Sequence, residues 1–257
     1  MSGENPAIQM SDLNIGYGGK PIMQGINLEI ARGEIFFIMG GSGSGKSTLL
    51  KTLIGLIPPV SGTIHYGDKP FSDNDPTTQA AILRDTGVLY QGGALFSSMT
   101  LQENVALPLR IHTSLSEKNL LEIAEYKLSL VGLSNATAKF PHEISGGMMK
   151  RAGLARALSL DPSILFFDEP SAGLDPLTSS QLDDTILELN SSLGTTTIIV
   201  SHELESIFSI ADRCVFLDAA TKRQIEVGDP RIMKTESTYA GIRDFLNRKK
   251  PESANAS

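Results

Sequence analysis

The sequence predicts an α/β fold in which a mainly parallel sheet carries helices on its faces. Four short apolar runs are continuous rather than alternating, which indicates strands buried on both sides. They lie at residues 34–39, 163–167, 195–200 and 213–217. Helical patterns alternate with these runs, at residues 46–56, 148–160, 177–193 and 203–211. Strand and helix in alternation are typical of parallel strands joined by helical crossovers.

Two other regions depart from this alternation. Residues 8–31 alternate apolar and polar side chains around the turn Tyr17-Gly-Gly-Lys20, which predicts an antiparallel β-subdomain with one wet face. Residues 98–160 hold several helical patterns and no convincing strand, so we expect an inserted α-helical subdomain there. We place one domain at residues 1–232 and a C-terminal tail at 233–257, whose polar end we expect to be disordered.

Composition narrows the class of protein. The chain has 257 residues, 40% hydrophobic and 20% charged, which is the profile of a globular protein. Its formal net charge of −7 argues against nucleic acid as a partner, since that partner normally requires a basic face. Cys214 is the single cysteine, which excludes an internal disulfide and indicates a reducing compartment such as the cytosol. No signal peptide and no run of about 18 to 20 apolar residues is present, so we expect no membrane span.

Residues 40–47 match the phosphate-binding pattern G-x-x-x-x-G-K-[ST], directly between an apolar run and a helical pattern. Backbone N–H groups of such a loop converge on phosphate oxygens, the helix N-terminus adds partial positive charge, and Lys46 adds a full one. Ser47 is the expected Mg²⁺ ligand from this loop. The alternative is a glycine-rich turn that binds nothing. The expected nucleotide contacts are Gly40, Gly41, Ser42, Gly43, Ser44, Gly45, Lys46, Ser47 and Thr48.

A carboxylate pair follows the second apolar run, at the strand end where ligands of parallel sheets bind. We expect Asp168 to join the Mg²⁺ shell and Glu169 to orient and deprotonate the attacking water. Alone, such a pair is most often a solvated turn, but the phosphate loop favours the functional interpretation. His202 follows the third run and is expected to bond the γ-phosphate. The other histidines are expected to be structural, namely His65, His112 and His142.

A second anion-binding device stands at Ser145-Gly146-Gly147, directly before a helical pattern. A hydroxyl, backbone donors and a helix N-terminus are offered together there. One nucleotide needs only one cradle, so the extra device suggests two chains paired about a two-fold axis, each closing on the other's nucleotide. The alternative is a serine N-cap with glycines for close packing.

These motifs together resemble those of ABC-transporter ATPase subunits, over about residues 8–230. The segment Ile144-Ser-Gly-Gly-Met-Met-Lys-Arg151 is similar to the family's signature motif, and Ser171-Ala-Gly-Leu-Asp175 is similar to its D-loop. Gln91 corresponds to the Q-loop glutamine, Tyr17 to the aromatic residue that stacks on adenine, and His202 to the switch histidine. The resemblance implies a P-loop NTPase (RecA-like) core that binds ATP with Mg²⁺, hydrolyses ATP and works as a homodimer. It adds Asp175 to the nucleotide contacts and Gln91 to the catalytic and metal-binding residues.

One departure narrows the resemblance. Met148 stands where most of the superfamily has Gln, and a thioether cannot make the hydrogen bonds of an amide. Together with Gln91-Gly-Gly-Ala-Leu-Phe96 and Glu103-Asn-Val-Ala-Leu-Pro-Leu-Arg110, this Met resembles the ATPases of MCE-type lipid transporters, the Mla phospholipid system in particular. That implies transmembrane permease subunits, an MCE-domain lipid-binding protein, a small STAS-domain protein and attachment at the cytoplasmic face of the inner membrane.

The permease is expected to dock beside Gln91, where Leu95, Phe96 and Met99 precede a helical pattern. The alternative is that these three side chains cover the core of the helical subdomain. Two other functions stay open. One is an ABC transport ATPase for a different substrate, and the other is a soluble ABC-type ATPase acting on nucleic acid or ribosomes.

Overall fold

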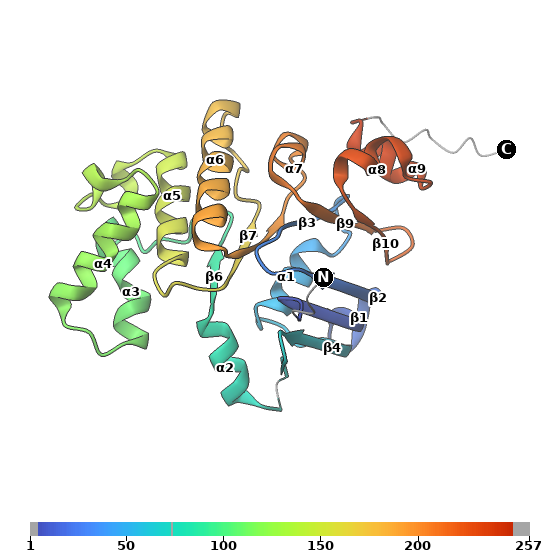
Figure 1. Cartoon of the computed structure of the whole chain (residues 1–257), viewed down its shortest axis with the longest axis horizontal. Coiled ribbons are helices and arrows are strands. Elements are labelled where there is room, and N and C mark those ends of the chain that lie inside the picture. The colour runs from blue at the N-terminus through green and yellow to red at the C-terminus, as the bar shows by residue number, and fades with distance from the viewer. Residues whose placement is uncertain (1–4, 73, 249–257) are drawn as a thin grey trace.

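The computed structural model describes residues 5–72 and 74–248. Its strands are β1 (Ile8–Tyr17), β2 (Lys20–Ile30), β3 (Ile35–Gly40), β4 (Ser61–Tyr66), β5 (Lys69–Pro70), β6 (Thr86–Leu89), β7 (Ile164–Asp168), β8 (Thr196–Val200), β9 (Arg213–Asp218) and β10 (Arg223–Gly228). Its α-helices are α1 (Lys46–Leu53), α2 (Pro76–Arg84), α3 (Leu101–His112), α4 (Glu117–Leu130), α5 (Gly146–Ala157), α6 (Pro176–Leu193), α7 (Leu204–Ile210), α8 (Pro230–Glu236) and α9 (Ala240–Leu246). The described strands form one sheet in the order β5-β4-β1-β2-β10-β9-β3-β8-β7-β6 (Figure 1).

The parallel half of the sheet confirms the predicted α/β core. Strands β9, β3, β8, β7 and β6 are all parallel, and the four predicted apolar runs form β3, β7, β8 and β9. Their side chains are buried on both faces, as continuous apolar runs predict. Strand β10 runs antiparallel to β9 and joins this half to β2 through a single pair, Arg223 with Gln24.

The N-terminal half is antiparallel, as the alternation of residues 8–31 predicts. Strands β1 and β2 pair from Ile8 opposite Ile30 to Tyr17 opposite Lys20. The turn between them consists of Gly18 and Gly19, with φ of 56° and 75°. Two successive left-handed residues are what a tight hairpin turn requires, and glycine adopts that conformation without steric cost. Strand β4 extends this part of the sheet from the other edge of β1.

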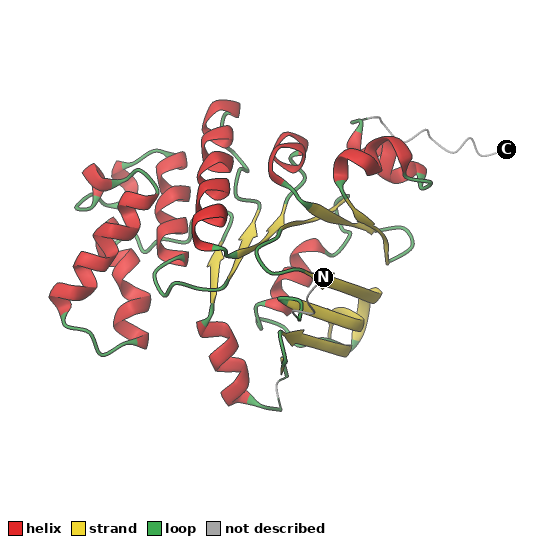
Figure 2. Cartoon of the chain, viewed as in Figure 1, coloured by secondary structure: helices red, strands yellow, loops and turns green. Residues whose placement is uncertain are grey.

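Helices cover both faces of the parallel strands (Figure 2). Alternate residues of β3 belong to two different hydrophobic clusters. Phe37 packs in the cluster that holds the apolar faces of α3 to α7, whereas Phe36 packs in the cluster that holds α1 and the antiparallel strands. Because successive side chains of a strand point to opposite faces, one buried strand serves both layers. The phosphate-loop helix α1 is thus enclosed between the two halves of the sheet.

Helices α3, α4 and α5 lie side by side at one end of the sheet, within the range expected for the helical subdomain (Figure 1). Each begins at a hydroxyl N-cap. Thr100 forms a capping box with Glu103, Ser116 accepts from the N–H of Asn119, and Ser145 accepts from the N–H of Met148. Such caps satisfy N–H groups that lack a partner within the helix.

Two predicted boundaries differ from the structure. Helix α1 ends at Leu53 rather than near residue 56, because Gly55 follows in a left-handed conformation with φ of 72°. The boundary expected between residues 232 and 233 falls inside α8, whose Met233 side chain is buried beside Cys214. Ile242 and Leu246 of α9 are buried in the same cluster, so the chain to residue 248 packs on the core. The disorder expected at the end of the tail concerns residues outside the described range.

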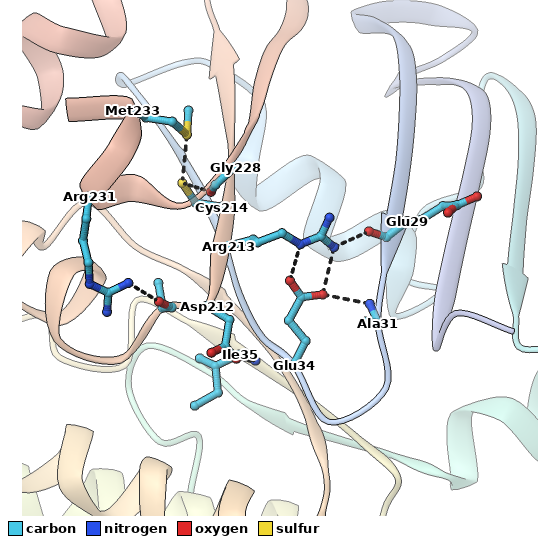
Figure 3. Close-up of polar contacts among 11 residues, drawn as sticks. Glu29, Ala31, Glu34, Ile35, Asp212, Arg213, Cys214, Gly228, Arg231 and Met233 are labelled. Atoms are coloured by element: carbon cyan, nitrogen blue, oxygen red, sulfur yellow. Dashed lines mark hydrogen bonds and ion pairs between the residues drawn. The ribbon is translucent and has the colours of Figure 1, made fainter. Parts of the chain in front are cut away.

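An ion pair fixes the amino ends of the central strands (Figure 3). Arg213 begins β9, and its Nε and Nη2 donate to the two carboxylate oxygens of buried Glu34 at 2.6 and 2.9 Å. Nη2 also donates to the carbonyl of Glu29 at 2.8 Å, and Glu34 accepts from the N–H of Ala31 at 2.8 Å. Bidentate pairs of this kind are geometrically specific. The contact therefore anchors the end of β2 against β3 and β9.

Candidate nucleotide site

The candidate site lies along the carboxyl ends of the parallel strands. Strand β3 runs into the loop 40–45, β7 ends at Asp168, β8 leads to His202 and β6 leads to Gln91. Pairing of Asp168 with Val200 and of Leu89 with Phe167 aligns these ends in register. The structure therefore brings four separate segments of the predicted site to one edge of the sheet, where parallel sheets bind ligands.

The backbone of loop 40–45 depends on its glycines. A Cβ at Gly40 would lie 2.3 Å from the carbonyl oxygen of Leu217 and 2.7 Å from Ser44 Oγ, so only glycine fits there. Gly43 and Gly45 are left-handed, with φ of 76° and 85°, and α1 begins directly after them. Ser44 is buried, and its hydroxyl has no protein partner within the described residues. A buried hydroxyl without a hydrogen-bond partner costs free energy, so the Ser44 hydroxyl is suited to bind a ligand in this loop.

Lys46 lies across the mouth of this loop. Its ammonium donates to the carbonyls of Gly40 at 2.8 Å and Gly41 at 3.0 Å. Burial lowers the pKa of Lys46, and the carboxylates of Glu169 and Asp168 oppose that shift. The Lys46 ammonium can exchange these two neutral carbonyls for charged phosphate oxygens with little movement of its side chain.

Asp168 lies among cations. Burial raises the pKa of its carboxyl, and the neighbouring charge of Glu169 raises it further. Lys51, Lys150 and Lys46 lower it, in that order. A carboxylate flanked by a second carboxylate and by positive charges is the kind of group whose protonation a cation or a phosphate controls.

Glu169 and His202 are in direct contact. His202 Nδ1 lies 2.9 Å from Glu169 Oε1, while Glu169 Oε2 is buried without a protein partner among the described residues. The Glu169 backbone is left-handed, with φ of 49°, and its N–H donates to the carbonyl of Val200 at 2.9 Å. Non-glycine residues with this φ are uncommon and cluster at functional sites. The pair thus presents one carboxylate oxygen held by an imidazole and one oxygen available to a ligand.

Other predicted residues border the same edge. The ring of Tyr17 is 52% exposed, and its hydroxyl oxygen lies 3.4 Å from Thr48 Oγ1 in the first turn of α1. Ser47 is exposed beside it. Gln91 is exposed as well, and its main-chain carbonyl accepts from Lys150. An exposed aromatic face next to a phosphate-binding loop offers a surface on which a base can stack.

The signature segment lies elsewhere in the chain. It packs on the start of α6, because a Cβ at Gly147 would lie 2.4 Å from Thr178 Cγ2 and one at Gly146 would lie 3.9 Å from Leu174 Cδ2. Ser145 and Gly146 are exposed at the start of α5. Asp175 caps α6 by accepting from Thr178 N–H at 3.1 Å and Thr178 Oγ1 at 2.6 Å, and these bonds lower the pKa of the Asp175 carboxyl.

Sequence reasoning missed two lysines near the carboxylates. Lys150 and Lys51 both act on the charge of Asp168. Lys150 lies on the buried face of α5 with Gly147 and Leu154, at the spacing of three and four residues that defines one face of a helix. That spacing is the available sequence signal, although a lysine in a helix is ordinarily solvated.

The described residues lack two kinds of feature. Residues 5–72 and 74–248 hold no group of three His, Cys, Asp or Glu side chains arranged to bind a metal ion. The donors that are present suit Mg²⁺, which typically takes one or two protein oxygens and completes its shell with phosphates and water. Across the same residues, none of the helices has the length and apolarity needed to cross a membrane.

The chain belongs to the ABC transporter family. A family model described as ABC transporter matches residues 23–172, and the fold and loop 40–47 agree with that assignment. The chain is thus an ATPase of the ATP-binding-cassette class, as the motifs predict.

Individual relatives support the assignment over most of the chain. Probable ribonucleotide transport ATP-binding protein mkl of Mycobacterium leprae (strain TN) is 40% identical over 241 residues, which are 94% of this chain and 69% of that protein. Intermembrane phospholipid transport system ATP-binding protein MlaF of Escherichia coli (strain K12) is 38% identical over 240 residues, 93% of this chain and 88% of that protein. The chain spans 66% of the Mycobacterium tuberculosis (strain ATCC 25618 / H37Rv) protein that it matches.

A solved structure agrees in fold. The dimeric structure of a post-hydrolysis state of the ATP-binding cassette MJ0796, bound to ADP and Pi, superposes with a TM-score of 0.77 at 27% identity. The match covers 86% of this chain and 98% of that one.

Proposed function

We propose that this chain is the motor subunit of a transporter that moves phospholipid between membranes, and that it binds and hydrolyses ATP as a homodimer. The observation that carries the proposal is the similarity to MlaF, a phospholipid transport ATP-binding protein, over 93% of the chain. The edge of the sheet at the carboxyl ends of its parallel strands supplies the groups that ATP hydrolysis requires.

Each residue of the site has a role in this reaction. Lys46 and the amides of loop 40–45 bind the phosphates of ATP, and Tyr17 stacks on adenine. Glu169 orients the attacking water and accepts its proton, while His202 holds the carboxylate and senses the γ-phosphate. The contact of 2.9 Å between His202 Nδ1 and Glu169 Oε1 supports this pairing.

The site also has residues that would hold Mg²⁺ beside the phosphates of ATP. Ser47 and Asp168 are the residues that would hold Mg²⁺, with Gln91 as a further ligand. Burial raises the pKa of Asp168, and the charges of Lys51, Lys150 and Lys46 oppose that rise. A metal ion held by these residues would supply positive charge to offset the negative charge on the phosphate oxygens.

A second chain completes the site in this proposal. Ser145 and Gly146 are exposed at the N-terminus of α5, and buried Gly147 follows them against Thr178 of α6. Pairing about a two-fold axis brings each such N-terminus, with Asp175 beside it, to the nucleotide of the partner. The dimer of the MJ0796 cassette supports this arrangement, because it is a pair of the same fold.

Transmembrane permease subunits are the proposed partners, docking on the segment after β6. Phe96 is 52% exposed there, and Leu95 and Met99 are half-buried. Fully buried Asn104 holds the segment rigid, since it accepts from the N–H of Phe96 at 2.7 Å and donates to the carbonyls of Phe96 and Met99 at 3.1 and 3.2 Å. An exposed aromatic ring on a preorganised loop is the kind of anchor that dominates protein interfaces. Docking there attaches the chain to the cytoplasmic face of the inner membrane.

The mycobacterial relatives favour a second cargo. The relative from Mycobacterium leprae, at 40% identity, is named a probable ribonucleotide transport ATP-binding protein, and the ATPase machinery alone does not select between the two cargos. Phospholipid is preferred here because the chain covers 88% of MlaF but 69% of the mycobacterial protein. An MCE-domain lipid-binding protein and a small STAS-domain protein are the further partners that a lipid transporter of this type would contain.

Purification from detergent-solubilised membranes tests the proposal. The chain is captured, and every co-purifying subunit and small molecule is identified by mass spectrometry. We expect a permease, an MCE-domain protein and phospholipid. A complex with bound ribonucleotide in place of lipid supports the second cargo, and the absence of any membrane subunit contradicts both. Phe96→Glu is expected to release the permease while isolated ATP binding is kept.

A further inference from the structure

Lys150 is a buried lysine with two main-chain partners. Its side chain is 6% exposed, and its ammonium donates to the carbonyl of Gln91 and, at 3.4 Å, to the carbonyl of Glu169. None of the carboxylates in the described chain comes within 4.0 Å of this ammonium. Burying a cation is costly unless it has partners, so the position of Lys150 calls for an explanation.

Several contacts join helix α5 to the loop after β6 and make them one packed unit. Arg156 of α5 donates to the carbonyls of Gly93 at 3.1 Å and Ala94 at 2.6 Å. The two backbones also meet directly, because a Cβ at Gly153 would lie 3.0 Å from the carbonyl oxygen of Gly93. With Lys150 on Gln91, this loop is held to α5 by two cations and a glycine contact. These contacts tie the position of the loop to that of α5.

Lys150 is the side chain of that unit that reaches the catalytic strand end. Glu169, which it contacts, has the left-handed φ of 49°. Such a conformation persists only where surrounding bonds enforce it. The bonds available to its main chain are the N–H to Val200, and the carbonyl with Ala172 N–H at 3.2 Å and Lys150. Of these, the bond from Lys150 comes from a helix packed against the strands rather than from the strands or the turn itself.

We propose that Lys150 is a positioning residue of the ATPase reaction, which holds the Glu169 main chain in place and makes that placement depend on how α5 is seated. This inference rests on the proposed function. Helix α5 begins at Ser145 and Gly146, which are proposed to face the partner's nucleotide. Lys150 therefore connects that helix to Glu169, the general base of the site in its own chain. Closure of two chains would then be sensed by Glu169 through a single side chain.

Kinetic constants distinguish positioning from a structural role. Lys150 touches neither the phosphate loop nor Tyr17, and its charge acts on Asp168 without forming an ion pair, so we expect its removal to change ATP affinity little. Misplacing a catalytic group by about 1 Å costs about a hundredfold in rate. We therefore expect Lys150→Met to lower kcat by about ten- to hundredfold with KM for ATP within about twofold. Lys150→Arg retains donors to both carbonyls and should recover most of kcat.

The experiment measures steady-state ATP hydrolysis by the full-length protein with Mg²⁺. The matched control is Lys127→Met, because Lys127 is also buried, 4% exposed, and lies on α4 paired with Asp161 far from Gln91 and Glu169. The control should keep the wild-type kcat. Glu169→Gln distinguishes failure of the Lys150 inference from failure of the proposed function. If hydrolysis continues without the Glu169 carboxylate, the proposed function is wrong as well as the role of Lys150.

The expected result is a fall in kcat for Lys150→Met that Lys127→Met does not share and that Lys150→Arg largely reverses. If Lys150→Met does not fold, Lys150→Gln takes its place, because its shorter amide keeps a donor but cannot span both carbonyls. A Lys150→Gln variant is then expected to show a lower kcat than Lys150→Arg at equal KM. Wild-type kcat in Lys150→Met or Lys150→Gln, or an equal loss in Lys127→Met, overturns the proposal.

Discussion

The substitution Gly147→Ala separates packing from chemistry at the signature segment. A Cβ at Gly147 would lie 2.4 Å from Cγ2 of Thr178, about 1 Å closer than ordinary contact. Thr178 is β-branched and therefore stiff, and its hydroxyl bonds Asp175 at 2.6 Å, so it cannot turn aside without breaking the cap of α6. Overpacking of this kind costs about 1–3 kcal/mol, and the better helix propensity of Ala returns up to about 1 kcal/mol.

The net expectation is a loss of about 1–2 kcal/mol in the free energy of unfolding, which lowers Tm by roughly 2–4 °C per kcal/mol. Thermal unfolding by circular dichroism measures it. Thr178→Ser keeps the hydroxyl and removes the clashing methyl, so the double variant should recover the loss. Gly146→Ala is the matched control, since its nearest neighbour would be Leu174 Cδ2 at 3.9 Å. An unchanged Tm in Gly147→Ala, or no recovery with Thr178→Ser, refutes the packing argument.

Three further expectations concern charge and the shared site. Lys46→Ala should weaken ATP binding and lower kcat together, measured by titration with a fluorescent nucleotide and by phosphate release, because the ammonium faces the phosphates in ground and transition states alike. Ser145→Arg should block the opposing site, and mixing it with excess Lys46→Ala chains should restore part of the activity, whereas no restoration argues against sites shared between chains. Burial raises the pKa of Asp183 to about 6, so wild-type stability falls as pH rises from about 4 to about 6. Asp183→Asn should remove that fall. It should raise the free energy of unfolding at pH 7, measured by urea denaturation, by at most about 3 kcal/mol, since the pKa shift of about two units corresponds to about 1.36 kcal/mol per unit. Equal urea curves at pH 4 and pH 7 in the wild type contradict this expectation.

The sequence was informative where burial is complete. The continuous apolar runs of β3, β7, β8 and β9 predicted the parallel core, because strands covered on both faces need no polar side. Strand β6 was not anticipated, since Thr86–Leu89 is four residues long and holds a glycine. That glycine is required by packing, because a Cβ there would lie 2.2 Å from the carbonyl oxygen of Ala157. Such a requirement comes from a distant segment and leaves no local pattern.

The site followed a similar rule. Residues on glycine-rich loops and strand ends could be proposed from the sequence because their motifs are contiguous, as in loop 40–47. Lys150 was not assigned a role, since α5 is rich in Ala and Gly and its buried face is marked in the sequence only by the spacing of Gly147, Lys150 and Leu154. Asp175 was expected to contact nucleotide, and its carboxylate caps α6 in the single chain, a bond that depends on Thr178 three residues later. Tertiary placement, rather than residue type, decides such cases.

ATP bound at Lys46 is proposed to hold two chains together as a dimer until Glu169 activates the water that hydrolyses the ATP. The most direct test is size-exclusion chromatography of Glu169→Gln with ATP and Mg²⁺, alongside phosphate release. We expect the variant to retain ATP, elute as a dimer and release no phosphate above background, because the carboxylate that accepts the proton is gone and the phosphate-binding groups remain. A monomer under saturating ATP, or hydrolysis at the wild-type rate, contradicts the account.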